Sequence, residues 1–182
     1  MAKHHKEIDA KLAKFIKAQP MFFVATAAAE GRVNLSPKGL DGTFAIISPN
    51  KVAFLNLTGS GNETAAHLLK NDRITIMFCS FDKVPMILRL YGNAKAIHAN
   101  DEEWGDYIGL FNDVPGKRQI IIINVFDIIT SCGYAVPQME LVEQRDILVD
   151  WADKKGEEGV KNYWKEKNQK SFDGFETKIP ID

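Results

Sequence analysis

The stretch Asn56–Leu69 reads NLTGSGNETAAHLL, and the rest of the chain is interpreted outward from it. The apolar run Val52–Leu55 precedes it and predicts a buried strand, while its closing alanines and leucines predict a short helix. The loop between them is a candidate phosphate site, because the first turn of a helix leaves backbone N–H groups free and carries partial positive charge. Gly59 and Gly61 let the backbone approach a ligand closely. Short hydrogen-bonding side chains surround them: Thr58, Ser60, Asn62 and Thr64.

An ordinary helix start explains the same loop equally well. Ser, Thr and Asn are common N-cap residues, and glycine is common in loops. The spacing contains neither the Gly-Lys-Ser/Thr of a Walker loop nor a Rossmann fingerprint. On the loop alone, a phosphate site and a plain capped helix both remain open.

Length and composition predict a cytoplasmic globular protein. The chain has 182 residues, 45% hydrophobic content and a net charge of -1, so charge gives no argument for nucleic acid or an anionic membrane. No signal-peptide core and no run of roughly 20 apolar residues is present. Cys79 and Cys132 are expected to be buried, reduced thiols. His4 and His5 lie in a terminus that we expect to be frayed, and no metal site is expected.

Short apolar runs separated by turns predict an antiparallel barrel decorated with helices. A parallel sheet would need a crossover helix between most strands, and most connections here are too short. Gly92 interrupts a long strand and predicts a bulge or a sharp bend. An amphipathic helix is expected from Ile8 to near Gln19. Strands are expected over 21–26, 33–36, 43–47, 52–55, 73–79, 86–97 and 120–126, the last extending toward Ile129.

The second half of the sequence predicts helices as well as strands. Asp101 is expected to cap a helix that carries Trp104, and from about Gln144 onward a charged helix is expected, interrupted by Gly156. The chain is therefore divided into a barrel domain, residues 1–143, and a helical extension, residues 144–182, that packs on the barrel or on a dimer partner.

The order of these features resembles the pyridoxamine 5′-phosphate oxidase-like family, the FMN-binding split β-barrels. The resemblance covers roughly residues 10–135. It begins with the first helix, the strand Phe22–Thr26 and its hairpin, and continues with a strand that ends in Ser36-Pro37-Lys38-Gly39. The strand, loop and helix around Thr58 follow, and then the strand Leu88–Ala94. This order is more specific than any single piece.

The resemblance implies a homodimer with FMN bound in clefts between the subunits. It places the strand ending at Lys38 along the flavin and the Thr58 loop against the phosphate. Lys38 is then a cation beside the flavin or the phosphate rather than a surface lysine, and Arg89 binds phosphate rather than a structural carboxylate. The cofactor-binding positions implied in this way are Ser36, Lys38, Gly39, Thr58, Gly59, Ser60, Asn62, Thr64 and Arg89.

Three departures from the oxidase pattern predict a different reaction. Asn62-Glu63-Thr64 replaces the Ser-Arg-Lys triplet that neutralises the phosphate, and Glu63 is expected to point outward. Ile87 replaces a glutamine that contacts the flavin ring, and the C-terminal Arg and His that bind substrate have no match. The family therefore implies FMN binding, without pyridoxamine phosphate oxidation as the expected activity.

The sequence leaves three functions open. The first is an FMN-dependent oxidoreductase that exchanges hydride or electrons with an unknown small molecule, such as a reduced nicotinamide, through flavin N5. The second is a non-catalytic protein that binds a flavin, a deazaflavin, haem or a pyridoxal phosphate-like ligand. The third is a dimeric structural protein without a working site. No catalytic residue can be assigned by spacing.

Overall fold

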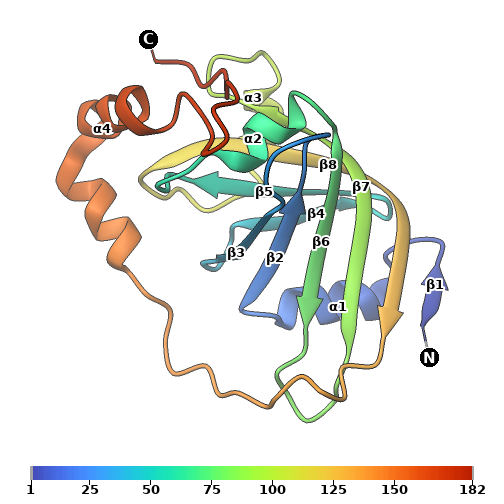
Figure 1. Cartoon of the computed structure of the whole chain (residues 1–182). Coiled ribbons are helices and arrows are strands. Elements are labelled where there is room, and N and C mark those ends of the chain that lie inside the picture. The colour runs from blue at the N-terminus through green and yellow to red at the C-terminus, as the bar shows by residue number, and fades with distance from the viewer. Residues whose placement is uncertain (1, 182) are drawn as a thin grey trace.

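Eight strands form one curled antiparallel sheet in residues 2–181, which the computed structural model describes (Figure 1). The order is β3-β2-β6-β7-β8-β5-β4, with β1 paired to β8 beyond the end of β5. The edge strands β3 and β4 are consecutive in the chain but do not pair, which confirms the predicted split barrel. The strands are β1 Lys3–His5, β2 Met21–Thr26, β3 Asn34–Gly39, β4 Phe44–Ser48, β5 Lys51–Leu57, β6 Arg73–Cys79, β7 Ile87–Ile97 and β8 Lys117–Ser131.

The core lies inside the curl of the sheet. Alternate residues of the strands point inward, so that Val24, Phe54, Ile76 and Leu90 are fully buried together. A second, smaller cluster lies on the other face of β5 and β8, under α3. Residues Ile120–Ile123 of β8 serve both clusters, which explains why this strand is apolar without alternation.

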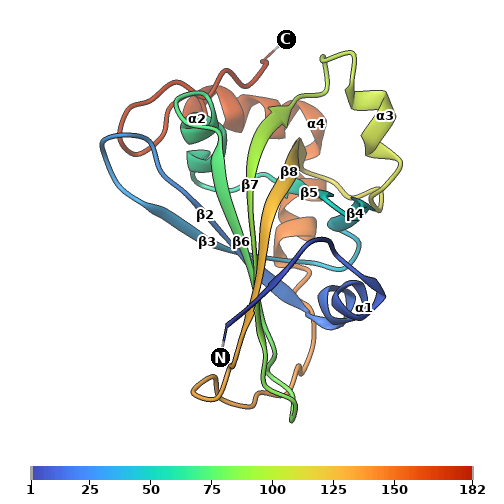
Figure 2. The same cartoon turned by 90° about the vertical axis from the view of Figure 1, so that its right-hand side faces the viewer.

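Helices cover both ends of the curled sheet. Helix α1, Ala10–Ala18, is capped at its N-terminus by Asp9, whose carboxylate accepts the Leu12 N–H at 2.8 Å. Figures 1 and 2 show α1 at one end and α2, Glu63–Leu68, at the other. Helix α3, Trp104–Ile108, packs outside β8. None of the helices in residues 2–181 is both long and apolar enough to span a bilayer.

Gly92 lies at a β-bulge, as its place in the sequence predicts. Tyr91 pairs with Asp127 and Gly92 pairs with Val125, so Phe126 is the extra residue on β8. The two longest strands bend at this point, which lets the sheet curl toward closure.

Two predictions are wrong, one about the N-terminus and one about the cysteines. The N-terminus is not frayed, because β1 pairs with the end of β8, and His4 and His5 bond to Asp127 and Thr130. Cys79 is buried, but Cys132 is exposed just beyond β8.

Two element boundaries also differ from those predicted. Strand β3 continues through Pro37 to Gly39, because an edge strand has no neighbour that needs the missing proline N–H. Helix α3 begins after Glu103, whereas Asp101 accepts the backbone N–H of His98 at 2.8 Å instead of capping the helix.

The chain beyond β8 returns to α2. Residues 132–146 contain no helix or strand; they pass below the lower ends of the strands in Figure 1 and rise to α4. Helix α4, Ile147–Lys167, is kinked at Gly156, whose φ of 66° and ψ of 172° are not helical, as the sequence predicts. We name residues 168–181, which follow α4, the C-terminal strap.

Candidate functional site

The loop from Thr58 to Asn62 presents a run of free backbone donors. Thr58 anchors it, because both its N–H and its hydroxyl donate to the carbonyl of Gly116 at 2.8 Å. Among the described residues, no acceptor takes a hydrogen bond from the backbone N–H groups of residues 59–65. The Asn62 side chain is 1% exposed, does not cap α2, and has neither amide atom hydrogen-bonded. Such a set of unpaired donors suits an anion.

Arg118 on β8 supplies a buried cation beside this loop. It is 3% exposed, and its Nη1 donates to the carbonyl of Gly61 and to Oδ1 of Asn168, both at 2.9 Å. Within residues 2–181 no carboxylate pairs with it, and its Nε has no partner. Burial lowers the pKa of Arg118 to about 10, so the guanidinium keeps its charge at neutral pH. A buried charge without a counter-ion is costly, and a bound anion would relieve that cost.

Lys38 forms a second polar group across the split of the barrel. It lies on the edge strand β3, and its Nζ donates at 3.0 Å to Oδ1 of Asn56 on β5. Gln119 pairs with Asn56 across β5 and β8, is fully buried, and has no hydrogen bond on either amide atom. Burial lowers the pKa of Lys38 to about 8, and the positive charge of Arg118 contributes to the same shift. The loop and the split therefore share one electropositive region.

The other predicted positions around the loop have separate roles. Ser60 is exposed at the outer side of the loop, whereas the hydroxyl of Thr64 accepts a hydrogen bond from Asn34 at 3.2 Å and is turned toward β3. Ser36 and Gly39 lie on the same edge strand as Lys38. The hydrogen bond to Asn56 thus links Lys38 to the strand that leads into the loop.

Arg89 lies far from the loop within one chain. It pairs with Ile129 near the end of β8, and its Nη1 donates to the Ser131 hydroxyl at 3.2 Å. Arg118 is the second residue of the same strand, so the two arginines lie toward opposite ends of the β7–β8 ladder. Within one chain Arg89 does not reach the loop, and a role beside phosphate would need a second subunit; that role stays a prediction.

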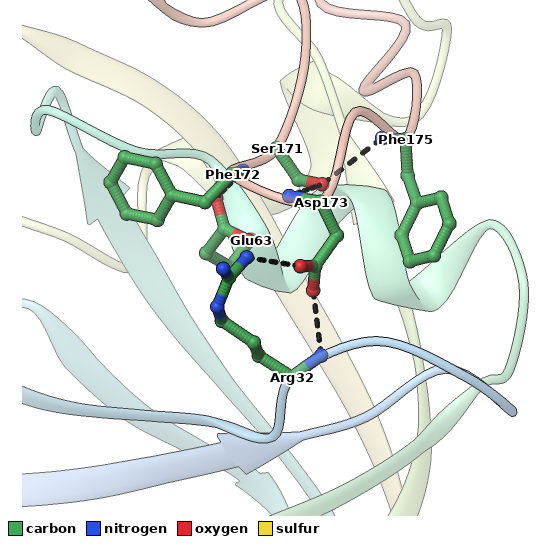
Figure 3. Close-up of polar contacts among 6 residues, drawn as sticks. All are labelled: Arg32, Glu63, Ser171, Phe172, Asp173 and Phe175. Atoms are coloured by element: carbon green, nitrogen blue, oxygen red, sulfur yellow. Dashed lines mark hydrogen bonds and ion pairs between the residues drawn. The ribbon is translucent and has the colours of Figure 1, made fainter.

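The C-terminal strap also contacts α2 and the end of the loop (Figure 3). Glu63 accepts the backbone N–H of Phe172 at 3.0 Å, and the Phe172 ring lies against Gly61. Asp173 pairs with the side chain of Arg32 and accepts its backbone N–H at 2.7 Å. The strap is thereby attached both to α2 and to the turn between β2 and β3.

Sequence reasoning missed Arg118 and Asn168. Arg118 follows a Pro-Gly turn at the start of an apolar strand, where arginine is normally at the surface, and only the pairing of β5 with β8 brings it to the loop. Asn168 lies in a polar tail with no motif. The one feature of the sequence that could have indicated Arg118 is its position as a charged residue next to the most apolar strand.

Fold and site together define a split-barrel protein with a candidate anion-binding loop between β5 and α2. A model of the pyridoxamine 5′-phosphate oxidase family matches residues 8–132, and the chain belongs to this family. Over 141 residues it is 42% identical to the pyridoxamine 5′-phosphate oxidase family protein ustO of Aspergillus flavus. This match covers 75% of the chain but 57% of ustO, so the chain spans little more than half the length of that relative.

Solved structures confirm the fold. HupZ of Group A Streptococcus superposes with a TM-score of 0.50 at 21% identity, covering 66% of this chain and 91% of that one. A variant of HupZ gives a TM-score of 0.52 at 20% identity, with 68% and 99% covered. The family match ends at residue 132, so α4 and the C-terminal strap lie outside it.

Proposed function

We propose that the protein is a homodimeric FMN-binding oxidoreductase that binds the cofactor phosphate at the Gly59–Asn62 loop. The observation that carries this proposal is the run of backbone N–H groups without acceptors beside the buried Arg118, which has no carboxylate partner within residues 2–181. These groups fit a phosphate, because the loop supplies several donors and Arg118 adds one full positive charge behind the loop, on the side of its carbonyls. Family membership supports a flavin as the molecule that carries the phosphate.

Lys38 is proposed to face the ring or the ribityl chain at the split between β3 and β5. A bound flavin would supply hydride or electron transfer to a small organic molecule or from a reduced nicotinamide. The ammonium group of Lys38 would attract negative charge that develops on the ring, and its hydrogen bond to Asn56 fixes its position. Its lowered pKa means that this charge can be lost in mildly alkaline solution.

Titration of the purified protein with FMN tests the proposal directly. We expect saturable quenching of flavin fluorescence at micromolar concentrations, or visible flavin absorbance in the fresh protein. Haem, pyridoxal phosphate and a deazaflavin serve as competing ligands in the same assay. Absence of flavin together with no micromolar binding of added FMN would refute the proposal and favour a structural protein without a working site.

A non-catalytic flavin protein is the second candidate. The observation that favours it is Ile87, an apolar residue where the oxidases have a glutamine against the ring. Anaerobic mixing of the FMN complex with NADH or NADPH separates the two functions. Bleaching of the flavin absorbance supports an oxidoreductase, whereas a flavin that neither nicotinamide nor common acceptors turn over supports storage or sensing.

A homodimer is part of the same proposal. Leu35 on the edge strand β3 is 63% exposed, and Phe126 on β8 also leaves a large apolar side chain in solvent. Light scattering of the purified chain would give twice the 20.4 kDa mass of one chain. A monomeric mass with bound FMN would show that a single chain completes the site.

Glu63→Gln is expected to strengthen FMN binding about fivefold. The carboxylate lies beside Gly61 and repels a phosphate in the loop by about 1 kcal/mol, taking a separation of roughly 8 Å and an intermediate dielectric. Glutamine keeps the acceptor for the Phe172 N–H and removes the charge. Fluorescence titration measures the change, with Glu140→Gln, an exposed residue far along the chain, as the control. Weaker or unchanged binding would place the phosphate elsewhere.

A further inference from the structure

We infer that Asn168 of the C-terminal strap, together with Arg118, is a positioning residue of the anion site, an inference that rests on the proposed function. Asn168 is fully buried. Its Nδ2 donates to the carbonyl of Gly59 at 3.0 Å, and its Oδ1 accepts from Nη1 of Arg118. The same Nη1 donates to the carbonyl of Gly61, so two side chains hold two alternate carbonyls of the loop.

The direction of these carbonyls fixes the direction of the donors. In a trans peptide the C=O and the following N–H point to opposite sides. The described part of the chain contains no cis peptide bond, so the N–H groups of Ser60 and Asn62 point away from Asn168 and Arg118. Both donors are therefore presented on the opposite side of the loop, where Ser60 is exposed to solvent. Asn168 acts on the ligand through the loop backbone.

Asn168 is itself held firmly. Its N–H closes the end of α4 on the Trp164 carbonyl at 3.0 Å, and its own carbonyl accepts the Thr177 hydroxyl at 2.6 Å. The indole N–H of Trp164 donates to the Thr58 hydroxyl at 2.8 Å, which joins α4 to the start of the loop. Prearranged donors lose little entropy when an anion binds, so this support increases affinity without touching the ligand.

The loop also contains buried groups that lack partners. The Asn62 amide and Nε of Arg118 have no hydrogen bond among the described residues, although both side chains are more than nine-tenths buried. Buried polar groups are nearly always paired, so these atoms indicate that a ligand or water completes the site. The extension beyond the family match thus supplies part of the cofactor site.

Variants of Asn168 test this inference by two readouts. We expect Asn168→Ala and Asn168→Asp to weaken FMN binding about tenfold. Both variants remove the donor to Gly59, while aspartate keeps an acceptor for Arg118 and the shape of the side chain. Asp173→Ala is the matched control, because it removes another attachment of the strap and touches no loop carbonyl. Its affinity should stay within twofold of the native chain.

Titration with inorganic phosphate, followed by the amide NMR signals of Ser60 and Asn62, tests the geometry without the flavin. We expect phosphate to shift both signals in the native chain and in Asp173→Ala, and to require about tenfold more phosphate for the same shifts in the Asn168 variants. Native FMN affinity in a folded Asn168→Asp overturns the inference and leaves the proposed function standing. Equal weakening by Asp173→Ala also overturns it, since docking of the strap in general would explain the effect. If the native chain shows the phosphate response but no FMN binding, the proposed function fails and the role of Asn168 stands.

Discussion

Alanine at position 92 is expected to lower the free energy of unfolding by about 3 kcal/mol. A Cβ at Gly92 would lie 2.5 Å from the Ile123 side chain and 2.6 Å from the backbone carbonyl oxygen of Asn124. The carbonyl belongs to the neighbouring strand β8, so relief requires β7 and β8 to separate at the bulge. For a chain of this length the midpoint of thermal unfolding should fall by about 10 °C.

Gly105→Ala is the matched control for this prediction. Gly105 lies in α3, and a Cβ there would meet nothing within 4 Å. Alanine favours the helix, so this variant should be neutral or slightly more stable than the native chain. Circular dichroism melts of both variants give the comparison. A midpoint for Gly92→Ala within about 1 °C of the native value would show that the bulge accommodates a side chain freely.

Local patterns predict the strands and their antiparallel order well, because each strand carries its own apolar run and its own turns. Gly92 is the clearest case, since a glycine inside a long strand indicates a bend from sequence alone. Strand β1 was missed for the opposite reason. Lys3–His5 has no apolar residue, and its strand conformation depends on free backbone groups at the end of β8.

The candidate site was predictable only in part. The loop is recognisable because its glycines, hydroxyl side chains and helix start are contiguous. The positive charge beside the loop cannot be recognised from the sequence, because Arg118 reaches the loop through pairing between strands about sixty residues apart in the chain. Asn168 arrives from still farther along the sequence, in a segment without periodicity. Long-range contacts of single polar residues leave no local pattern.

Lys38→Met is expected to weaken FMN binding about thirtyfold at pH 7. A charge-assisted contact with an anionic group contributes about 2 kcal/mol, and methionine fills the space without a charge. The fold should survive, because the substitution removes a partly buried charge and leaves only the Asn56 acceptor unpaired. Fluorescence titration measures the affinity, and Lys83→Met, at an exposed lysine in the loop between β6 and β7, is the control.

The pH dependence of FMN binding distinguishes the effect of the Lys38 charge from the effect of the shape of its side chain. With a pKa of about 8, roughly nine-tenths of Lys38 is protonated at pH 7 and about one-tenth at pH 9 in the ligand-free protein. A bound anion raises this pKa, so binding above pH 8 takes up a proton and FMN affinity should fall about tenfold from pH 7 to pH 9.

The stability of the fold changes with pH in the opposite direction. In the unfolded chain Lys38 has its ordinary pKa of 10.5, so between pH 8 and 10.5 the unfolded state binds more protons, and the free energy of unfolding rises with pH. Lost affinity at pH 9 therefore cannot come from loss of the Lys38 contribution to stability. The Lys38→Met variant should bind with the same affinity at both values, and an equal fall in the variant would assign the titration to another group.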